Sequence, residues 1–245
     1  MSKIKNWFSH SVTAALFAVA AMGFALSANA TVYKLYCSPN ATGAASEDCL
    51  TPETAGYPMT AIDLAATTFS PAAGDEVQVV FLPGTYHLQA GTSWWAGGSY
   101  HNVNGFGSAR FVLTSSTGDF RDVTLDFDDI INPTLLYVGN GNGGLGYRGL
   151  TFTHIESTGT SAFCGIHGGN VNGLYFDGCR FLECLANPEK TTSQRYFCNN
   201  GYTHEYVWVY RCVFDRCGRA DWPGGGWSFG RGAQFFTFDC KAMYD

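Results

Sequence analysis

The chain has 245 residues with 14 basic and 20 acidic side chains, so its formal charge is −6. Binding of nucleic acid selects for basic patches, and this acidic balance argues against a nucleic-acid partner. Charged residues make up 14% of the chain, aromatic residues reach 16% and glycine accounts for 30 positions, a composition that excludes intrinsic disorder and favours a β-rich protein with many turns.

Residues 1–30 have the organisation of a secretory signal. Lys3 and Lys5 precede an apolar run over 12–26, and Ala28-Asn29-Ala30 supplies the small residues of a cleavage site. The apolar run is shorter than the roughly 20 residues that a membrane-spanning helix needs. We therefore expect an exported protein, extracellular, periplasmic or at the cell surface, with no integral membrane segment once the signal is removed.

The mature chain divides into two regions. Residues 31–75 predict a strand at 32–36, a loop rich in small residues and one helix at about 60–67. Residues 76–245 predict strands, first from the alternation that starts at Val77, separated by glycine-rich loops. All nine cysteines follow the signal, and an odd number leaves at least one thiol free or paired between chains. Cys37 and Cys49 flank the first loop and are our predicted disulfide.

A short apolar pattern recurs at intervals of 24 to 33 residues. It occupies Val123–Leu125, Leu150–Phe152, Leu174–Phe176 and Val207–Val209. The segments 174–184 and 207–217 match best, and they align two pairs of cysteines. A period of this length with short apolar strands indicates a stacked parallel β-helix, in which equivalent residues form columns about 4.8 Å apart. We expect the helix at 60–67 to cover its N-terminal end.

The same region carries a series of motifs that resembles a known family. The series is Tyr36-Cys-Ser-Pro-Asn40, Thr51-Pro-Glu-Thr54, the helix, Gly74-Asp-Glu-Val77 and Leu82-Pro-Gly-Thr-Tyr86. It looks like the N-terminal part of bacterial secreted proteins of the pectate-lyase-like superfamily. The resemblance implies an all-β, right-handed parallel β-helix with a short N-terminal capping helix. The last repeat stops at Asp245 without a cap, the pattern expected of a chain truncated at its C-terminus.

An acidic cluster at Asp126, Asp128 and Asp129 is the candidate metal site. Asp126 and Asp128 share one face of a strand, because side chains alternate. Lyases of the family hold Ca²⁺ with such aspartates, and the ion bridges uronate carboxylates to the protein. The resemblance therefore implies Ca²⁺ as a cofactor, whereas a solvated turn is the alternative interpretation.

Three residues are catalytic candidates. Arg180 and Arg216 lie at outward positions of the best-matched repeats, and the resemblance implies a basic residue that removes the proton next to the uronate carboxylate. Glu183 stacks on Arg216 by the repeat offset, so an ion pair between repeats is the alternative. His167 is the candidate of a hydrolase of the same fold, although the Asn-x-Asp and Arg-x-Lys motifs of those hydrolases are missing.

The cysteine spacing also allows a zinc site, at Cys164 with His167, Cys179 with Cys184, and Cys212 with Cys217. The equivalent positions of these cysteines in the two best-matched repeats favour stacked core columns or disulfides between repeats instead.

Aromatic side chains that can stack on sugar rings are the candidate binding residues. They are Trp94 and Trp95 in one loop, Trp222 and Trp227 in another, and Tyr175 and Trp208 on adjacent repeats. Two functions follow. The first is an exported protein that acts on or binds extracellular polysaccharide, as a Ca²⁺-assisted uronate lyase if it is an enzyme. The second is a non-catalytic adhesin or glycan-binding module of a longer secreted protein.

Overall fold

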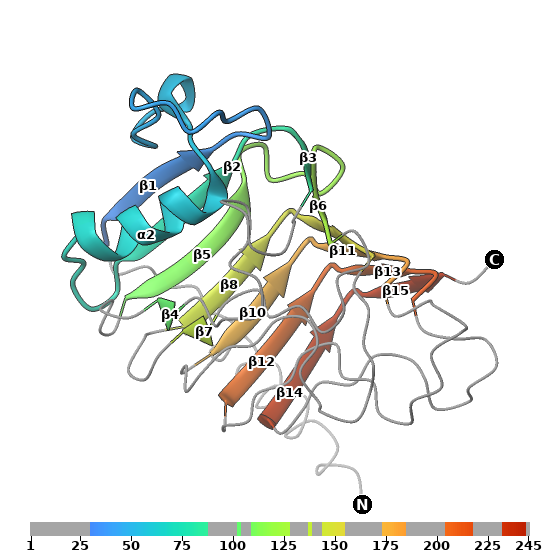
Figure 1. Cartoon of the computed structure of the whole chain (residues 1–245). Helices are drawn as coiled ribbons and strands as arrows, with labels where there is room; N and C mark the ends of the chain where they lie inside the picture. The colour runs from blue at the N-terminus through green and yellow to red at the C-terminus, as the bar shows by residue number, and fades with distance from the viewer. Residues whose placement is uncertain are drawn as a thin grey trace, which may run out of the picture.

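The protein is described from a computed structural model, which places residues 30–87, 102–103, 109–127, 137–138, 144–154, 173–184, 204–217 and 232–243. Within these ranges, parallel strands form two large sheets and one pair (Figure 1). The seven-stranded sheet consists of β1 (Val32–Cys37), β2 (Glu76–Phe81), β5 (Arg110–Ser115), β8 (Gly144–Arg148), β10 (Leu174–Asp177), β12 (His204–Tyr210) and β14 (Gly232–Phe238). The six-stranded sheet consists of β3 (Gly84–His87), β6 (Val123–Asp126), β9 (Thr151–Thr153), β11 (Arg180–Leu182), β13 (Val213–Asp215) and β15 (Lys241–Met243). β4 (Asn102–Val103) pairs with β7 (Tyr137–Val138).

Strands of the two large sheets alternate along the chain. Each strand pairs in parallel with its equivalent one repeat later, so that one position of the seven-stranded sheet holds Val77, Phe111, Leu145, Leu174, Val207 and Phe235. Neighbours in this series are 28 to 34 residues apart. The predicted alignment of 174–184 with 207–217 is confirmed, because Leu174 pairs with Val207 and Phe181 with Phe214.

The recurring segments form two sets of columns and not one, so the prediction was wrong where it stacked Phe152 on Phe176. Leu125 and Phe152 pair with each other in the six-stranded sheet, whereas Phe176 and Val209 pair in the seven-stranded sheet. The partner of Phe176 on the preceding repeat is Tyr147. Both sheets contain the same pattern of two apolar residues around an outward one, so pattern matching alone merged two different columns.

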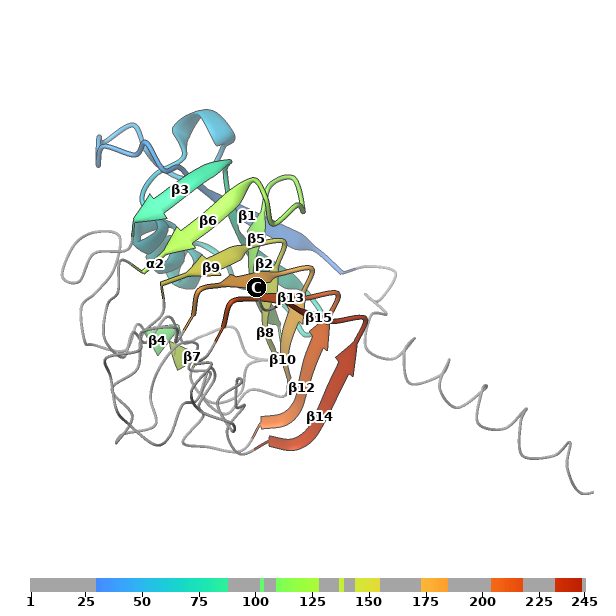
Figure 2. The same ribbon diagram turned by 90° about the vertical axis from the view of Figure 1, so that its right-hand side faces the viewer.

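From β8 onward, two-residue corners join the strands of the two sheets, which meet along one edge (Figure 2). The first corner residue has a left-handed backbone, and it is Gly149, Gly178, Arg211 or Asp239, with φ between 49° and 63°. The second residue is Leu150, Cys179, Cys212 or Cys240, of which the first three are fully buried. The left-handed residue turns the chain from one sheet into the other, and the next side chain then points into the core.

The core lies between the two sheets and contains stacked aromatic rings. Phe181 stacks on Phe152 at 5.2 Å and on Phe214 at 4.9 Å between ring centroids. Tyr147 stacks on Phe176 at 5.2 Å in the seven-stranded sheet. Burial of each such ring contributes about 1.5–3 kcal/mol, so these columns are a main source of stability.

One α-helix occurs in the described residues, α2 (Pro58–Thr68), preceded by the short 3-10 helix η1 (Pro52–Thr54). The helix predicted at 60–67 is confirmed, with a start at Pro58, a residue suited to the first turn. Ala61, Ile62 and Ala65 are buried and join the core, where α2 packs against β1 and β2. No helix in the described ranges is long and apolar enough to cross a membrane.

The predicted disulfide between Cys37 and Cys49 is not formed in the structure. Cys37 and Cys49 are both buried free thiols. They lie in one neighbourhood, because the Tyr36 amide donates to the Cys49 carbonyl at 2.7 Å. Each thiol has its own acceptor: Cys37 Sγ donates to the Val80 carbonyl at 3.5 Å and Cys49 Sγ to the Glu47 carbonyl at 3.9 Å.

Candidate functional site

Five of the predicted site residues belong to the described ranges, namely Asp126, Tyr175, Arg180, Trp208 and Arg216. The other predicted residues lie outside them, and these are Trp94, Trp95, Asp128, Asp129, His167, Trp222 and Trp227. The described five separate onto two surfaces. Asp126, Arg180 and Arg216 belong to the six-stranded sheet, and Tyr175 and Trp208 belong to the seven-stranded sheet.

The first surface begins with an aspartate between two histidines. Asp126 ends β6 beside His87 of β3, with Asp126 Oδ2 and His87 Nδ1 3.6 Å apart. His154 directly follows β9, and its Nδ1 is 2.8 Å from Asp126 Oδ1. Leu125 points into the core, so the alternation of the strand turns Asp126 outward toward both imidazoles.

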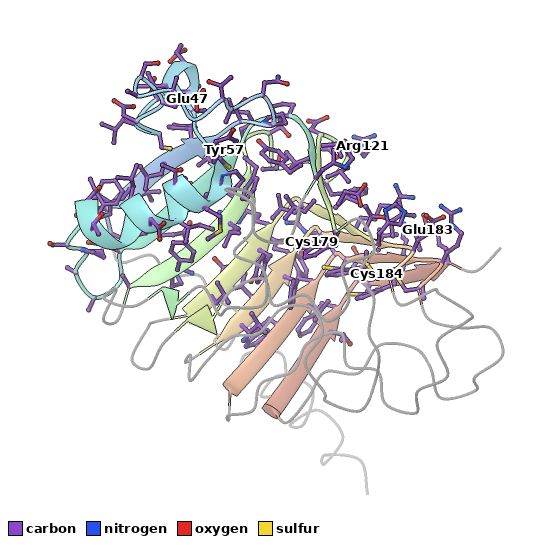
Figure 3. All side chains as sticks on the ribbon, viewed as in Figure 1. Glu47, Tyr57, Arg121, Cys179, Glu183 and Cys184 are labelled. Carbon is purple, nitrogen blue, oxygen red and sulfur yellow. The ribbon has the colours of Figure 1, made fainter. Side chains whose placement is uncertain are left out.

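The chain of ionisable groups continues over the next two repeats. His154 Nε2 is 3.5 Å from Glu183 Oε2, and Glu183 Oε1 is 2.8 Å from Arg216 Nη1. His154, Glu183 and Arg216 lie in equivalent positions, each directly after a strand of the six-stranded sheet, with left-handed φ of 55°, 53° and 51°. Figure 3 shows Glu183 at this end of the six-stranded sheet. The ion pair between Glu183 and Arg216 that the repeat offset predicted is confirmed.

Asp215 completes this set, which we call the charged row: His87, Asp126, His154, Glu183, Arg216, Asp215 and Arg180. Arg216 Nε is 3.4 Å from Asp215 Oδ1, and Arg180 Nη2 donates to Asp215 Oδ2. The hydrogen bond from Arg180 holds the pKa of Asp215 below its ordinary value. A guanidinium held by carboxylates keeps its proton, so Arg180 and Arg216 are poorly suited to remove a proton from a substrate.

The charged row does not fit a calcium site. Ca²⁺ takes six to eight oxygen ligands, whereas the two oxygens of Asp126 face imidazole nitrogens. No group of three or more His, Cys, Asp or Glu side chains that could hold a metal occurs within the described ranges. The calcium prediction now depends on Asp128 and Asp129, outside those ranges.

The cysteines of the best-matched repeats form core columns, as one reading of the sequence predicted. Cys179, Cys184, Cys212 and Cys217 are all buried in the core. Each donates to a carbonyl of the preceding repeat, for example Cys217 Sγ to Phe181 O at 3.1 Å. Interaction with Cys179 and burial raise the pKa of Cys212. Cys179 and Cys184, labelled in Figure 3, are both buried among the stacked apolar side chains, which supports the core columns.

The second surface is a group of aromatic residues on the outer face of the seven-stranded sheet. We call Tyr175, Trp208, Tyr210 and Phe238 the aromatic strip. Tyr175 pairs with Trp208 and Tyr210 with Phe238 across adjacent strands. The rings of Trp208 and Phe238 are nearly parallel, at 15° and 6.2 Å, and Phe238 is 44% exposed. Within the strip, Tyr210 and Phe238 therefore present apolar ring surface to solvent.

Polar groups border the aromatic strip. Arg211 Cζ lies 4.6 Å from the centre of the Tyr210 ring, and Arg211 Nη2 donates to Asp177 Oδ1 at 2.6 Å. This contact orients one guanidinium and one carboxylate beside the rings. Aromatic faces with adjoining hydrogen-bonding groups are the arrangement that binds sugar rings and their hydroxyls.

Two arginines and a buried hydroxyl lie further along the same sheet. Glu76 is buried, and its Oε2 is 3.4 Å from Arg110 Nη2 while its Oε1 is 3.5 Å from Arg148 Nη1. The ring of Tyr175 lies over Gly146, because a Cβ added there would be 2.0 Å from Tyr175 Cζ. The Tyr175 hydroxyl is buried and has no hydrogen-bond partner within the described part of the chain. Burial raises the pKa of this hydroxyl.

Searches of protein-family models, curated proteins and solved structures find no match to this chain. The resemblance to the pectate-lyase-like superfamily thus stays a prediction from the sequence motifs.

Proposed function

We propose that the chain is an exported right-handed parallel β-helix protein that binds extracellular polysaccharide along the outer face of its seven-stranded sheet. Three features support the fold: the alternation of strands between two sheets, the in-register repeats and the stacked inward columns. The signal-like residues 1–30 support export.

The aromatic strip is the observation that carries this proposal. Its four rings come from three neighbouring strands, which are spaced about 4.8 Å apart. A polysaccharide is long and repetitive, so a row of rings on a flat sheet can contact several sugars at once. Asp177 and Arg211 add hydrogen-bonding groups at the border of the strip.

Binding to a panel of polysaccharides tests the proposal. The exported protein is titrated with pectate, alginate, glycosaminoglycans and neutral glycans by isothermal calorimetry. We expect Phe238→Ala and Tyr210→Ala each to weaken binding about tenfold, the loss of one stacking contact. Leu50→Ala is the matched control, because Leu50 is exposed but lies in the first loop, away from the strip. Binding that survives both aromatic substitutions would contradict the proposal.

Acid–base catalysis on the polysaccharide is a second candidate, and the contact between His154 and Asp126 favours it. Asp126 orients the ring through Nδ1, and Nε2 lies 3.5 Å from Glu183, so proton transfer to a substrate requires that the substrate replace Glu183 at Nε2. His154 is 40% exposed, so a substrate can reach it. This arrangement suits a proton-transfer step in either elimination or hydrolysis.

A turnover assay separates the enzymatic candidates from a binding protein. New unsaturated ends are followed by ultraviolet absorbance and new reducing ends chemically, with and without Ca²⁺. Unsaturated product that is lost with His154→Gln and survives a chelator supports the charged row. Product that is lost with chelator and with Asp128→Ala supports the calcium-assisted lyase, and product without unsaturation supports hydrolysis. Binding without any turnover supports the adhesin or glycan-binding module.

A further inference from the structure

The region around Tyr175 has an excess of positive charge on a protein that is acidic as a whole. Arg110 and Arg148 share the carboxylate of Glu76, and Asp177, the cross-strand partner of Arg148, pairs with Arg211, so these three arginines and two carboxylates keep one net positive charge. Both contacts are longer than the 2.7–3.2 Å of good hydrogen bonds, at 3.4 and 3.5 Å. Most of the guanidinium N–H groups are therefore not used by Glu76.

The sheet register brings these groups together. Arg110 pairs with Gly144, and Arg148 lies two residues beyond Gly146 on the same strand. Tyr175 comes from the next strand, and its hydroxyl end covers Gly146, between the two arginine positions. Glycine at 146 is required for this placement, since a Cβ would occupy the position of the ring.

The Tyr175 hydroxyl is a second and independent observation. A buried hydroxyl without a partner destabilises the folded state, and such groups in folded proteins call for an explanation. An acceptor between the two arginines would satisfy the hydroxyl and the free guanidinium donors together. The side chains of Arg110 and Arg148 are 21% and 33% exposed, so a ligand can reach them from solvent.

We propose that Arg110, Arg148 and Tyr175 form an anion site that binds the carboxylate or sulfate groups of an acidic polysaccharide. This inference rests on the proposed function, which it deepens by naming the substrate class. The aromatic strip holds sugar rings, and the anion site selects acidic sugars on the same face of the sheet. Glu76 limits the affinity, because its carboxylate competes with the ligand for both guanidinium groups.

The test compares matched charged and uncharged ligands. Pectate and fully methyl-esterified pectin share a backbone and differ in charge, and dextran sulfate and dextran do the same for sulfate. We expect the protein to bind the charged member of at least one pair about tenfold more tightly, with an affinity that falls as salt is added. The pair that shows the preference tells carboxylate from sulfate.

Variants that are expected to change the affinity in opposite directions make the assignment specific. Arg148→Gln is expected to lower affinity for the charged ligand about tenfold and to leave the uncharged ligand unchanged. Glu76→Gln is expected to raise it, because the competing charge is removed and the shape is kept. Tyr175→Phe removes only the hydroxyl and should lower the preference with little effect on folding. Circular dichroism and the thermal midpoint identify any variant that fails to fold, and Arg110→Gln then replaces it.

The two proposals fail in different ways. If Phe238→Ala weakens binding but charged and uncharged ligands bind alike, or Glu76→Gln and Arg148→Gln have no effect, the anion site is wrong and the aromatic strip stands. If no polysaccharide binds, the proposed function falls, and galacturonate and inorganic sulfate then test the site alone by calorimetry. Small-anion binding that Arg148→Gln weakens supports the site, and no binding overturns it.

Discussion

Gly146 is the residue at which local geometry and the proposed specificity meet. A Cβ at this position would collide with the end of the Tyr175 ring, which can swing away from the strand. We therefore expect Gly146→Ala to cost about 1 kcal/mol in the free energy of unfolding, at the lower end of overpacking effects. The displaced hydroxyl would leave the arginines, so the affinity for an acidic polysaccharide should fall as it does in Tyr175→Phe.

Gly173→Ala is the control for this substitution, because a Cβ at 173 has no heavy atom within 4 Å. Urea unfolding and calorimetric titration of both variants check the prediction. An unchanged ligand preference in Gly146→Ala would show that the position of the Tyr175 ring is not important for binding.

Pairs of strands are stabilised by ion pairs that depend on pH. Arg180 of β11 donates to Asp215 of β13, and this bond lowers the pKa of Asp215 below the ordinary value of about 3.9. A lowered pKa in the folded state gives stability that is full above the unfolded pKa and is lost as pH falls through the folded pKa. We expect Arg180→Gln to cost about 1 kcal/mol at pH 6 and clearly less at pH 3.

Urea unfolding at the two pH values measures this difference. Arg121→Gln is the control, because Arg121 lowers the pKa of Asp119 to about 2 within a single exposed turn and connects no strands. An equal loss of stability at both pH values in Arg180→Gln would show that the charge of Asp215 is not responsible.

The repeat elements could be predicted from the sequence only where their spacing was unambiguous. Segments 174–184 and 207–217 share cysteines, aromatics and spacing, so their register and the pair of Glu183 with Arg216 followed directly. Val123–Leu125 and Leu150–Phe152 show the same short pattern in the other sheet, and nothing local distinguishes the two sheets. Gly149 before Leu150 is not a sufficient signal, because Gly173 precedes Leu174 in the same way although Leu174 belongs to the seven-stranded sheet.

The contacts of the candidate sites were harder to predict than the strands. Asp126 and His154 are 28 residues apart and meet only because His154 follows a strand aligned with the end of β6. The rings of Tyr210 and Phe238 are exposed because the opposite face of their strands packs into the core. Their exposure can be predicted only once it is known which face of the sheet is inward. Residue type suggested an acidic cluster with calcium, but the histidines beside Asp126 come from other repeats.

At the scale of the whole molecule, the two large sheets place different chemistry on different surfaces. The charged row follows the six-stranded sheet, and the aromatic strip with the anion site follows the seven-stranded sheet. The core between them contains a second set of aromatic rings. One fold therefore carries aromatic residues on the inside, where they pack, and on the outside, where we propose that they contact polysaccharide.

This division predicts opposite effects for two phenylalanines. Phe181 is fully buried between Phe152 and Phe214, so Phe181→Ala should cost about 3–5 kcal/mol and leave the affinity of the remaining folded protein unchanged. Phe238 is exposed on the aromatic strip, so Phe238→Ala should change stability by about 0.5 kcal/mol or less and weaken polysaccharide binding about tenfold. Urea unfolding and calorimetry on both variants give the four values. Phe181→Ala that is fully folded and yet fails to bind would contradict this division. Such a result would mean that the inner columns also shape the binding surface, because core rings and outer rings are attached to the same strands.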